Sequence, residues 1–317
     1  MARKAAVTAE PVQPAEPFDV VGQGDDPDWL DRRLTGVGAS EVAMMLGHHP
    51  KHGEGGPAVL WSWKTGRQEP EDLDEFENIQ WGHIMEPVIV EQYGSTRYAD
   101  RRVEKTRQQL RSKAHWWALC TLDAWTWHPR HGRIPLEVKN VGSYQAERWA
   151  AGVPIEMWWQ LQHQMLVTGS PCASIAACVG GNSLWWEDVA SDGRSQEILV
   201  AKGAEFWRCV CEHRVPLHVP TLASVRALYQ PGRESGTVQL TGGAWLELDD
   251  RVEELKREEK TARKERDELE ARLADAIGDH ETATLDSGVA YTRRTQTRRE
   301  TVIPASSFRV LRRKKGR

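Results

Sequence analysis

The sequence lacks the features that mark membrane proteins and exported proteins. No apolar run in the chain is long enough to cross a bilayer. The segment from Met1 to Asp26 is rich in Ala, Pro, Glu and Val and contains no continuous apolar stretch. We therefore interpret residues 1–27 as a disordered arm and not as a signal peptide. These absences predict a cytoplasmic protein that does not associate with a membrane.

Cysteines are few, and their spacing is wrong for a metal centre. The chain has five, and Cys209 and Cys211 form the only close pair. An odd number without C-x-x-C spacing argues against a disulfide framework and against a zinc or iron–sulfur site. His48, His49 and His52 lack a fourth ligand at suitable spacing, so we interpret them as loop residues.

A net positive charge is missing as well, since the formal net charge is −4. The charge is uneven, however: residues 293–317 contain ten Lys or Arg and one acidic residue, Glu300. A basic tail on an acidic body suits an anionic polymer as partner, and it also suits a simple solvated tail. The fifteen tryptophans can stack on unpaired bases, but we favour the interpretation that most fill the core.

What the sequence does contain is a set of acidic residues and a lysine that strand geometry brings together. Leu136 to Lys139 predicts a buried strand, in which Glu137 and Lys139 project to one side. Asp123 lies in an earlier strand-like run, and a hairpin through residues 128–133 would place it beside them. Mg²⁺ typically uses one or two protein carboxylates with substrate phosphate and water. The pattern therefore predicts metal-assisted cleavage of a phosphodiester.

A third carboxylate is predicted on a helix. Residues 78–93 favour a long helix in which Glu86 shares a face with Gly82, Ile89 and Val90. A carboxylate that points toward the interior needs a metal or a lysine, because an unpaired buried charge is costly.

Nearer the start of the chain, a helix beginning is predicted beside a basic residue. Ser40 is a plausible N-cap for the apolar run that ends at Gly47. A helix start with free N–H groups attracts phosphate, and Arg33 lies just upstream. We therefore expect phosphate binding at Arg33 and Ser40.

The pattern of the chain predicts a domain from residue 28 to residue 228 and a different segment after it. The boundary is placed near residues 229–243. Residues 244–317 are predicted to form a charged helix followed by a basic, strand-forming tail. The helix has apolar residues near heptad spacing, but Glu259 and Arg266 occupy the same seam. A coiled coil and a single amphipathic helix docked on a partner are both open interpretations.

The ordered set of motifs resembles the YqaJ-type viral recombinase family, relatives of phage lambda exonuclease in the PD-(D/E)xK nuclease superfamily. The resemblance covers residues 29–189 and rests on the ordered motifs Gly38-Ala39-Ser40-Glu41, Lys64-Thr65-Gly66, Gly82 to Pro87, Leu122-Asp123, Leu136 to Lys139, Trp149 to Pro154, and Gln160 to Gly169. It implies an α/β (α+β) fold, with a central mixed β-sheet flanked by helices and a C-terminal extension.

The resemblance also implies an activity: Mg²⁺-dependent digestion of linear duplex DNA from 5′ ends, leaving 3′ single-stranded overhangs for recombination. Two Mg²⁺ ions, or Mn²⁺ in their place, are implied. A single-strand annealing protein and a ring of identical subunits are implied as partners, together with double-stranded DNA ends.

The resemblance assigns expected roles residue by residue. Asp123, Glu137 and the Val138 carbonyl are expected to bind metal, and Glu86 to complete the site. Lys139 is expected to orient or activate the attacking water. Arg33 and Ser40 would hold phosphate, and Gln160 and Gln162 match helix glutamines near the metals, without showing which of the two contacts the site.

Other functions remain open. A restriction-like endonuclease shares the superfamily, and a CRISPR-associated iron–sulfur nuclease is disfavoured by the cysteine spacing. A catalytically silent DNA-binding or adaptor protein is the non-enzymatic alternative. In isolation, Glu137 and Lys139 also fit a surface ion pair worth about 0–1 kcal/mol.

Overall fold

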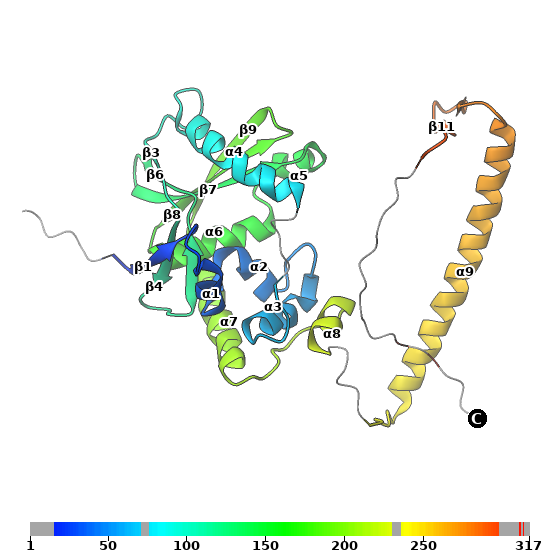
Figure 1. Ribbon diagram of the computed structural model, residues 1–317, viewed down its shortest axis with the longest axis horizontal. Helices are drawn as coiled ribbons and strands as arrows, with labels where there is room; N and C mark the ends of the chain where they lie inside the picture. The colour runs from blue at the N-terminus through cyan, green and yellow to red at the C-terminus, as the bar shows by residue number, and fades with distance from the viewer. Residues whose placement is uncertain (1–15, 71–75, 230–235, 298–310, 312, 314–317) are drawn as a thin grey trace, which may run out of the picture. The chain divides into compact units, whose positions relative to one another are not determined.

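The computed structural model describes residues 16–70, 76–229, 236–297, 311 and 313. The chain divides into two compact units, residues 1–230 and 231–317. Each is described separately below, and Figure 1 labels their helices and strands.

The first unit contains two β-sheets. The four-stranded sheet has the order β1-β4-β5-β2, and the five-stranded sheet has the order β3-β6-β7-β8-β9. The pairs β2·β5 and β7·β8 are parallel and the others antiparallel. The strands are β1 (Phe18–Gln23), β2 (Val37–Gly38), β3 (Val103–Lys105), β4 (Gln108–Ser112), β5 (Ala118–Thr121), β6 (Ala124–His128), β7 (Gly132–Val141), β8 (Cys172–Val179) and β9 (Ser183–Ala190).

Helices cover these sheets. They are α1 (Trp29–Leu34), α2 (Val42–Met45), α3 (Gly56–Lys64), α4 (Glu77–Gly94), α5 (Ala146–Ala150), α6 (Ile155–Thr168), α7 (Gly193–Cys211) and α8 (Leu222–Leu228). Three short 3₁₀ turns, Ala39–Glu41, Gly53–Gly55 and Ser143–Gln145, connect them. This arrangement confirms the expected fold class of a mixed β-sheet flanked by helices.

Helices cover both faces of the five-stranded sheet, and the side chains of its central strands point alternately to one face and to the other. Leu136 and Val138 of β7 pack with Ile89 and Val90 of α4. Residues at alternate positions of β8, such as Ile175, face the other way and pack with α6. Helices α4 and α6 therefore cover opposite faces of this sheet, and Glu137 lies on the face covered by α6.

The hairpin expected through residues 128–133 is confirmed. His128 pairs with Gly132 at the end of β6 and β7, and residues 129–131 form the turn. Gly132 has a φ of 70°, a conformation that suits glycine and closes a three-residue loop.

Two chain segments pass side by side from one sheet to the other. One joins β3 to β4, and the second joins β5 to β6 through Leu122 and Asp123. The two crossings are hydrogen bonded to each other, from Leu122 N–H to the Gln108 carbonyl at 3.2 Å and from Thr106 N–H to the Asp123 carbonyl at 3.0 Å. Asp123 thus lies between strands, where the sequence had suggested one continuous strand-like run.

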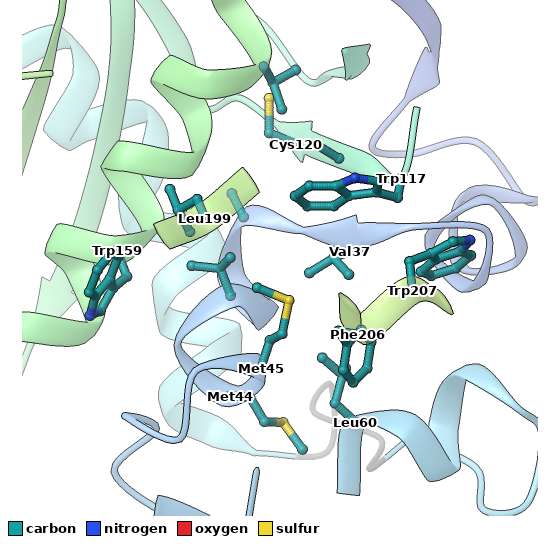
Figure 2. Close-up of a cluster of buried hydrophobic side chains, with 14 of the residues drawn as sticks. Val37, Met44, Met45, Leu60, Trp117, Cys120, Trp159, Leu199, Phe206 and Trp207 are labelled. Carbon is teal, nitrogen blue, oxygen red and sulfur yellow. The ribbon is translucent and has the colours of Figure 1, made fainter. Parts of the chain in front are cut away.

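A large apolar cluster supports the segment from residue 37 to residue 45. Figure 2 shows its side chains gathered around Val37 of β2, including Met44, Leu60 and Phe206. The cluster joins α2, α3 and α7 to β2 and β5, so it fixes the position of Arg33, which lies just before β2.

Three predictions near the chain start are corrected. Residues 18–23 belong to β1 and pair with β4, although the sequence placed them in a disordered arm; residues 1–15 lie outside the described part. Ser40 is no N-cap: it lies within the 3₁₀ turn, and the Glu41 carboxylate accepts the Gly38 N–H at 2.8 Å. The helix predicted to begin at Ser40 begins at Val42 as the short α2, and α1 and β2 precede it.

The second unit contains α9 (Gly243–Ile277) and a short hairpin of β10 (Thr282–Thr284) and β11 (Ala290–Thr292). Within the described residues, the expected strand-forming tail is this hairpin, and β11 ends at Thr292. Among the described helices, none is long and apolar enough to cross a membrane.

Candidate active site

The acidic residue and lysine of β7 lie together beside α6. Lys139 Nζ is ion paired with Glu137 Oε1, and Gln164 of α6 donates an N–H to Glu137 Oε2 at 2.6 Å. Glu137 is only 3% exposed, whereas the Lys139 side chain is 30% exposed. The pair is therefore a buried carboxylate with a lysine at the edge of solvent, and the alternative of a surface ion pair is wrong.

Asp123 approaches the same point from the crossing between the sheets. Its Oδ2 accepts the Val138 N–H at 2.8 Å, so its carboxylate is fixed next to the backbone between Glu137 and Lys139. Burial raises the pKa of Asp123, and the neighbouring Glu137 and Glu86 carboxylates raise it further, against the Lys139 ammonium and the Val138 hydrogen bond. Part of this increase in pKa comes from the crowding of negative charge, and a bound cation would relieve that crowding.

Lys139 keeps its proton in this setting. Burial alone would lower the pKa of Lys139, but the carboxylates of Glu137 and Asp123 outweigh it, and the pKa is raised. The ammonium is therefore positively charged at neutral pH, which suits a group that orients water or stabilises negative charge.

Glu86 reaches this site from the other side of the sheet. It lies half-buried on α4, in the turn before Ile89 and Val90, which pack on β7. Its charge contributes to the raised pKa of Asp123, so the two carboxylates are within electrostatic range. The structure thus brings all four predicted residues, Glu86, Asp123, Glu137 and Lys139, to one region.

The donor set fits a hard divalent cation. Within the described part of the chain, no three His, Cys, Asp or Glu side chains group closely enough to enclose a metal by themselves. Asp123 and Glu137 supply two carboxylates, the number Mg²⁺ typically takes from a protein. Gln164 Oε1 is also buried here without a hydrogen-bond partner among the described residues. In this state both Glu137 oxygens are engaged by Lys139 and Gln164.

A small cleft lies next to these residues. Its volume is about 60 Å³, and it is lined by Trp29, Arg33, Gly38, Ala39, Ser40, Gln109, Leu119, Cys120, Thr121 and Gln160. Cys120 connects the cleft with the carboxylates: burial raises its pKa first, and the charge of Glu137 raises it further. The predicted phosphate residues Arg33 and Ser40 are therefore brought together beside the acidic cluster.

Arg33 is held in place by a buried ion pair. Arg33 donates to Glu41 Oε1 at 3.0 Å and to Ser40 Oγ at 3.3 Å. Lys64 Nζ contacts Glu41 Oε2 at 2.7 Å and the Arg33 carbonyl at 2.6 Å. The network consists of two cations, Arg33 and Lys64, and one anion, Glu41. Its net charge is one positive unit, so the cleft favours an anion.

The glutamines of α6 separate into two faces. Gln160 lines the cleft and is 6% exposed, and its side chain has no hydrogen bond in the described part of the chain. Gln162 points the other way: it donates to the Ala190 carbonyl at 2.9 Å and accepts from Asp192 N–H at 3.0 Å. The expectation that Gln162 lies at the site is wrong, because it holds the segment between β9 and α7.

The residue that contacts the acidic cluster is Gln164, which lies within the quoted motif Gln160 to Gly169 but had no predicted role. The signal was its spacing: residues four apart share a helix face, so Gln164 accompanies Gln160 and not Gln162. Glu41 and Lys64 were likewise present in the quoted motifs without a role. No local pattern joins them, because they are twenty-three residues apart and meet only through tertiary packing.

Residues 28–171 match the family model for the YqaJ-like viral recombinase domain. This region contains strands β2 to β7, the acidic residues with their lysine, and the residues that line the cleft. The chain is 25% identical over 183 residues to the uncharacterized protein YqaJ of Bacillus subtilis (strain 168). That match covers 57% of this chain and 54% of the relative, so the chain spans about half of the relative's length.

Solved structures with a similar course of the chain include two exonucleases. An alkaline exonuclease from Laribacter hongkongensis has 14% identity and a TM-score of 0.49, over 59% of this chain and 94% of that one. A phage-related exonuclease from Haemophilus somnus 129PT has 13% identity and a TM-score of 0.39, over 56% of this chain and 96% of that one.

Proposed function

We propose that the protein is a Mg²⁺-dependent deoxyribonuclease that digests linear duplex DNA, from 5′ ends, to leave 3′ single-stranded overhangs for recombination. The observation that supports this most is the convergence of Asp123, Glu137 and Lys139 next to a cationic cleft that contains Arg33 and Ser40. A phosphodiester has a phosphate for the cleft and a scissile bond for the carboxylates, so the two features serve one substrate.

In this proposal Asp123 and Glu137 hold the cation, with the Val138 carbonyl as a further ligand and Glu86 completing the site. When bound, Mg²⁺ supplies positive charge that stabilises the oxygens of the reacting phosphate. Gln164 orients the Glu137 carboxylate through its 2.6 Å hydrogen bond. Lys139 is paired with Glu137 Oε1, so its ammonium would have to turn away for that oxygen to hold a cation, and it would then orient the attacking water.

The residues of the cleft support the proposal that the protein recognises a phosphate at the end of a DNA strand. The Arg33 guanidinium offers two or more N–H groups to phosphate oxygens, which suits bidentate recognition. Ser40 adds a hydroxyl donor, and Gln160 is a buried amide whose side chain has no hydrogen bond among the described residues. A terminal 5′ phosphate fits this set, and this choice of end is part of the proposal. A ring of subunits and an annealing partner stay predictions from the resemblance.

The first experiment compares linear and closed-circular duplex DNA with Mg²⁺ or with EDTA. We expect loss of the linear form alone, only with Mg²⁺, and no loss with Glu137→Ala. The matched control is Glu187→Ala, which removes an exposed carboxylate on β9 and should leave the activity intact. Cutting of the circle would show a restriction-like endonuclease. DNA binding without any cleavage would show a silent binding protein.

The end preference needs its own comparison. Linear duplexes that differ only in a 5′ phosphate or a 5′ hydroxyl are digested by the wild type and by Arg33→Gln. We expect the wild type to prefer the phosphorylated end and Arg33→Gln to lose that preference. Equal digestion of both ends by the wild type would contradict the role of the cleft while leaving the nuclease assignment intact.

A further inference from the structure

Helix α9 presents an apolar stripe that nothing in the described part of the second unit covers. Ile277 is its only buried residue. Val252, Leu255 and Leu269 are 40%, 46% and 50% exposed. Most helices owe their stability to packing of such a stripe, so a helix of this length needs a partner surface.

The stripe follows a heptad repeat over ten core positions. These are Trp245, Leu248, Val252, Leu255, Glu259, Ala262, Arg266, Leu269, Leu273 and Ala276. Two of them are charged, with opposite signs and seven residues apart. Arg266 pairs with Asp267 and Glu270 of its own helix, whereas Glu259 has no ion pair among the described residues.

We propose that α9 binds the α9 of a second copy of this chain as an antiparallel two-stranded coiled coil. In the register that the charges favour, Ala262 packs against Arg266 of the second copy. Leu255 then packs against Leu273, and Val252 against Ala276. This inference is independent of the nuclease proposal, because it rests on the second unit alone.

The residues that flank the seam support this register. In an antiparallel pair, flanking residues of one heptad position meet the same position of the other helix, and their charges set partner choice and orientation. Here Lys256 meets Glu270 of the second copy, and Glu258 meets Arg272. Each contact occurs twice by symmetry, so four opposite-charge pairs surround the core.

The two charged core residues also find opposite charges. Glu259 lies beside Arg272 of the second copy, and Arg266 lies beside Glu265. At the symmetry axis Arg263 and Glu265 each meet their own copy, and Arg263 already has Asp267 of its own helix 3.8 Å away. The seam charges, which weaken a simple coiled coil, are thus compensated in this arrangement.

A parallel pair would be repulsive. Glu259 would face Glu259 of the second copy in the core, and Arg266 would face Arg266. The flanking pairs would be Arg251 with Lys256, Glu258 with Arg263, and Glu265 with Glu270. The first and the third of these are like-charged, and opposed helix dipoles favour the antiparallel arrangement as well.

One of the two neighbouring antiparallel registers is also disfavoured. If Ala262 packed against Glu259 of the second copy, Lys256 would meet Arg263 and Glu258 would meet Glu265. Both contacts are like-charged and would occur twice. Charge complementarity within one sequence therefore favours the first of these two registers.

Disulfide trapping in the full-length chain tests the orientation. The exposed Cys211 is first replaced by serine, because the other four native cysteines are buried. In the Val252→Cys/Ala276→Cys variant we expect covalent dimers under mild oxidation. The two sites are about 36 Å apart within one helix, so they cannot join inside one chain. Val252→Cys alone is the control and should stay uncrosslinked. Efficient dimers with Val252→Cys alone would show a parallel pair and overturn the proposal.

Charge reversal tests the register through sedimentation velocity over a range of protein concentrations. Lys256→Glu should weaken the α9 contact by about three- to tenfold, because it creates two exposed like-charge pairs with Glu270. Adding Glu270→Lys should restore it. In a parallel pair Lys256→Glu would instead strengthen the contact, through Arg251. A strengthened contact in Lys256→Glu would refute the proposal. It would also be refuted if the wild type showed no association and the Val252→Cys/Ala276→Cys variant did not crosslink.

Discussion

The buried ion pair between Glu41 and Lys64 gives the sharpest prediction for stability. The Lys64 side chain is 1% exposed and the Glu41 side chain 9%. In Lys64→Met the methionine retains most of the volume but loses both contacts of the ammonium, with Glu41 Oε2 and with the Arg33 carbonyl. The Glu41 carboxylate is then left buried with less compensation.

The expected loss follows from what remains around Glu41. Removing one partner of a buried ion pair typically costs about 3–5 kcal/mol. Glu41 keeps the Arg33 guanidinium at 3.0 Å and the Gly38 N–H at 2.8 Å, so we expect the lower end, about 3 kcal/mol. For a domain of this size each kcal/mol shifts Tm by about 2–4 °C, so Tm should fall by about 6–12 °C.

A double-mutant cycle separates the pair from its surroundings. The cost of removing both charges from water offsets most of their attraction, so the pair itself adds little net stability. Glu41→Gln/Lys64→Met should therefore be more stable than the sum of the two single losses predicts, by about 1–3 kcal/mol. Urea denaturation measures each variant. A loss below about 1 kcal/mol for Lys64→Met, or simple additivity, would refute this account.

Three further predictions concern the site and its support. Burial lowers the pKa of His163 to about 4, so the stability it provides is complete above its ordinary pKa of 6.5 and is lost as pH falls toward 4, by about 3 kcal/mol; His163→Gln should show a shallower acid dependence in urea titrations at different pH values. Lys139→Met should lower the rate of Mg²⁺-dependent cleavage by about 10²–10³-fold with an unchanged circular dichroism spectrum, and full activity would exclude the proposed role. Gln164→Leu should lower the cleavage rate at little cost in stability. Gln162→Leu should instead cost about 2–4 kcal/mol of stability and leave the cleavage rate per folded molecule unchanged. The reverse pattern would contradict the assignment of the two faces of α6.

Much of the five-stranded sheet was predictable from the sequence. Strand alternation placed Glu137 and Lys139 opposite Leu136 and Val138, and the turn chemistry around Gly132 closed the hairpin. Both signals are local, since they depend on a period of two residues and on one glycine conformation. The helix with Glu86 was predictable for a similar reason.

Contacts between distant segments were not predictable. The capping role fell to Glu41 and not to Ser40, because the Glu41 carboxylate is fixed by Lys64 from another helix. Phe18 and its neighbours pair with β4 although their local composition suggests disorder, since pairing with a partner strand overrides composition. Helix spacing alone would have separated Gln162 from Gln164, but which face met Glu137 depended on how α6 packs.

Asp123 lies on one of the two chain segments that cross from one sheet to the other. The crossings through Thr106 and Leu122 are hydrogen bonded to each other on both sides of the bend, so neither can straighten alone. The paired segments hold Asp123 at the junction of the two sheets, and a double-stranded connection resists twisting better than a single strand. The amide protons of Thr106 and Leu122 should exchange with solvent in one shared opening event, and their common exchange rate reports how often the site loses its shape.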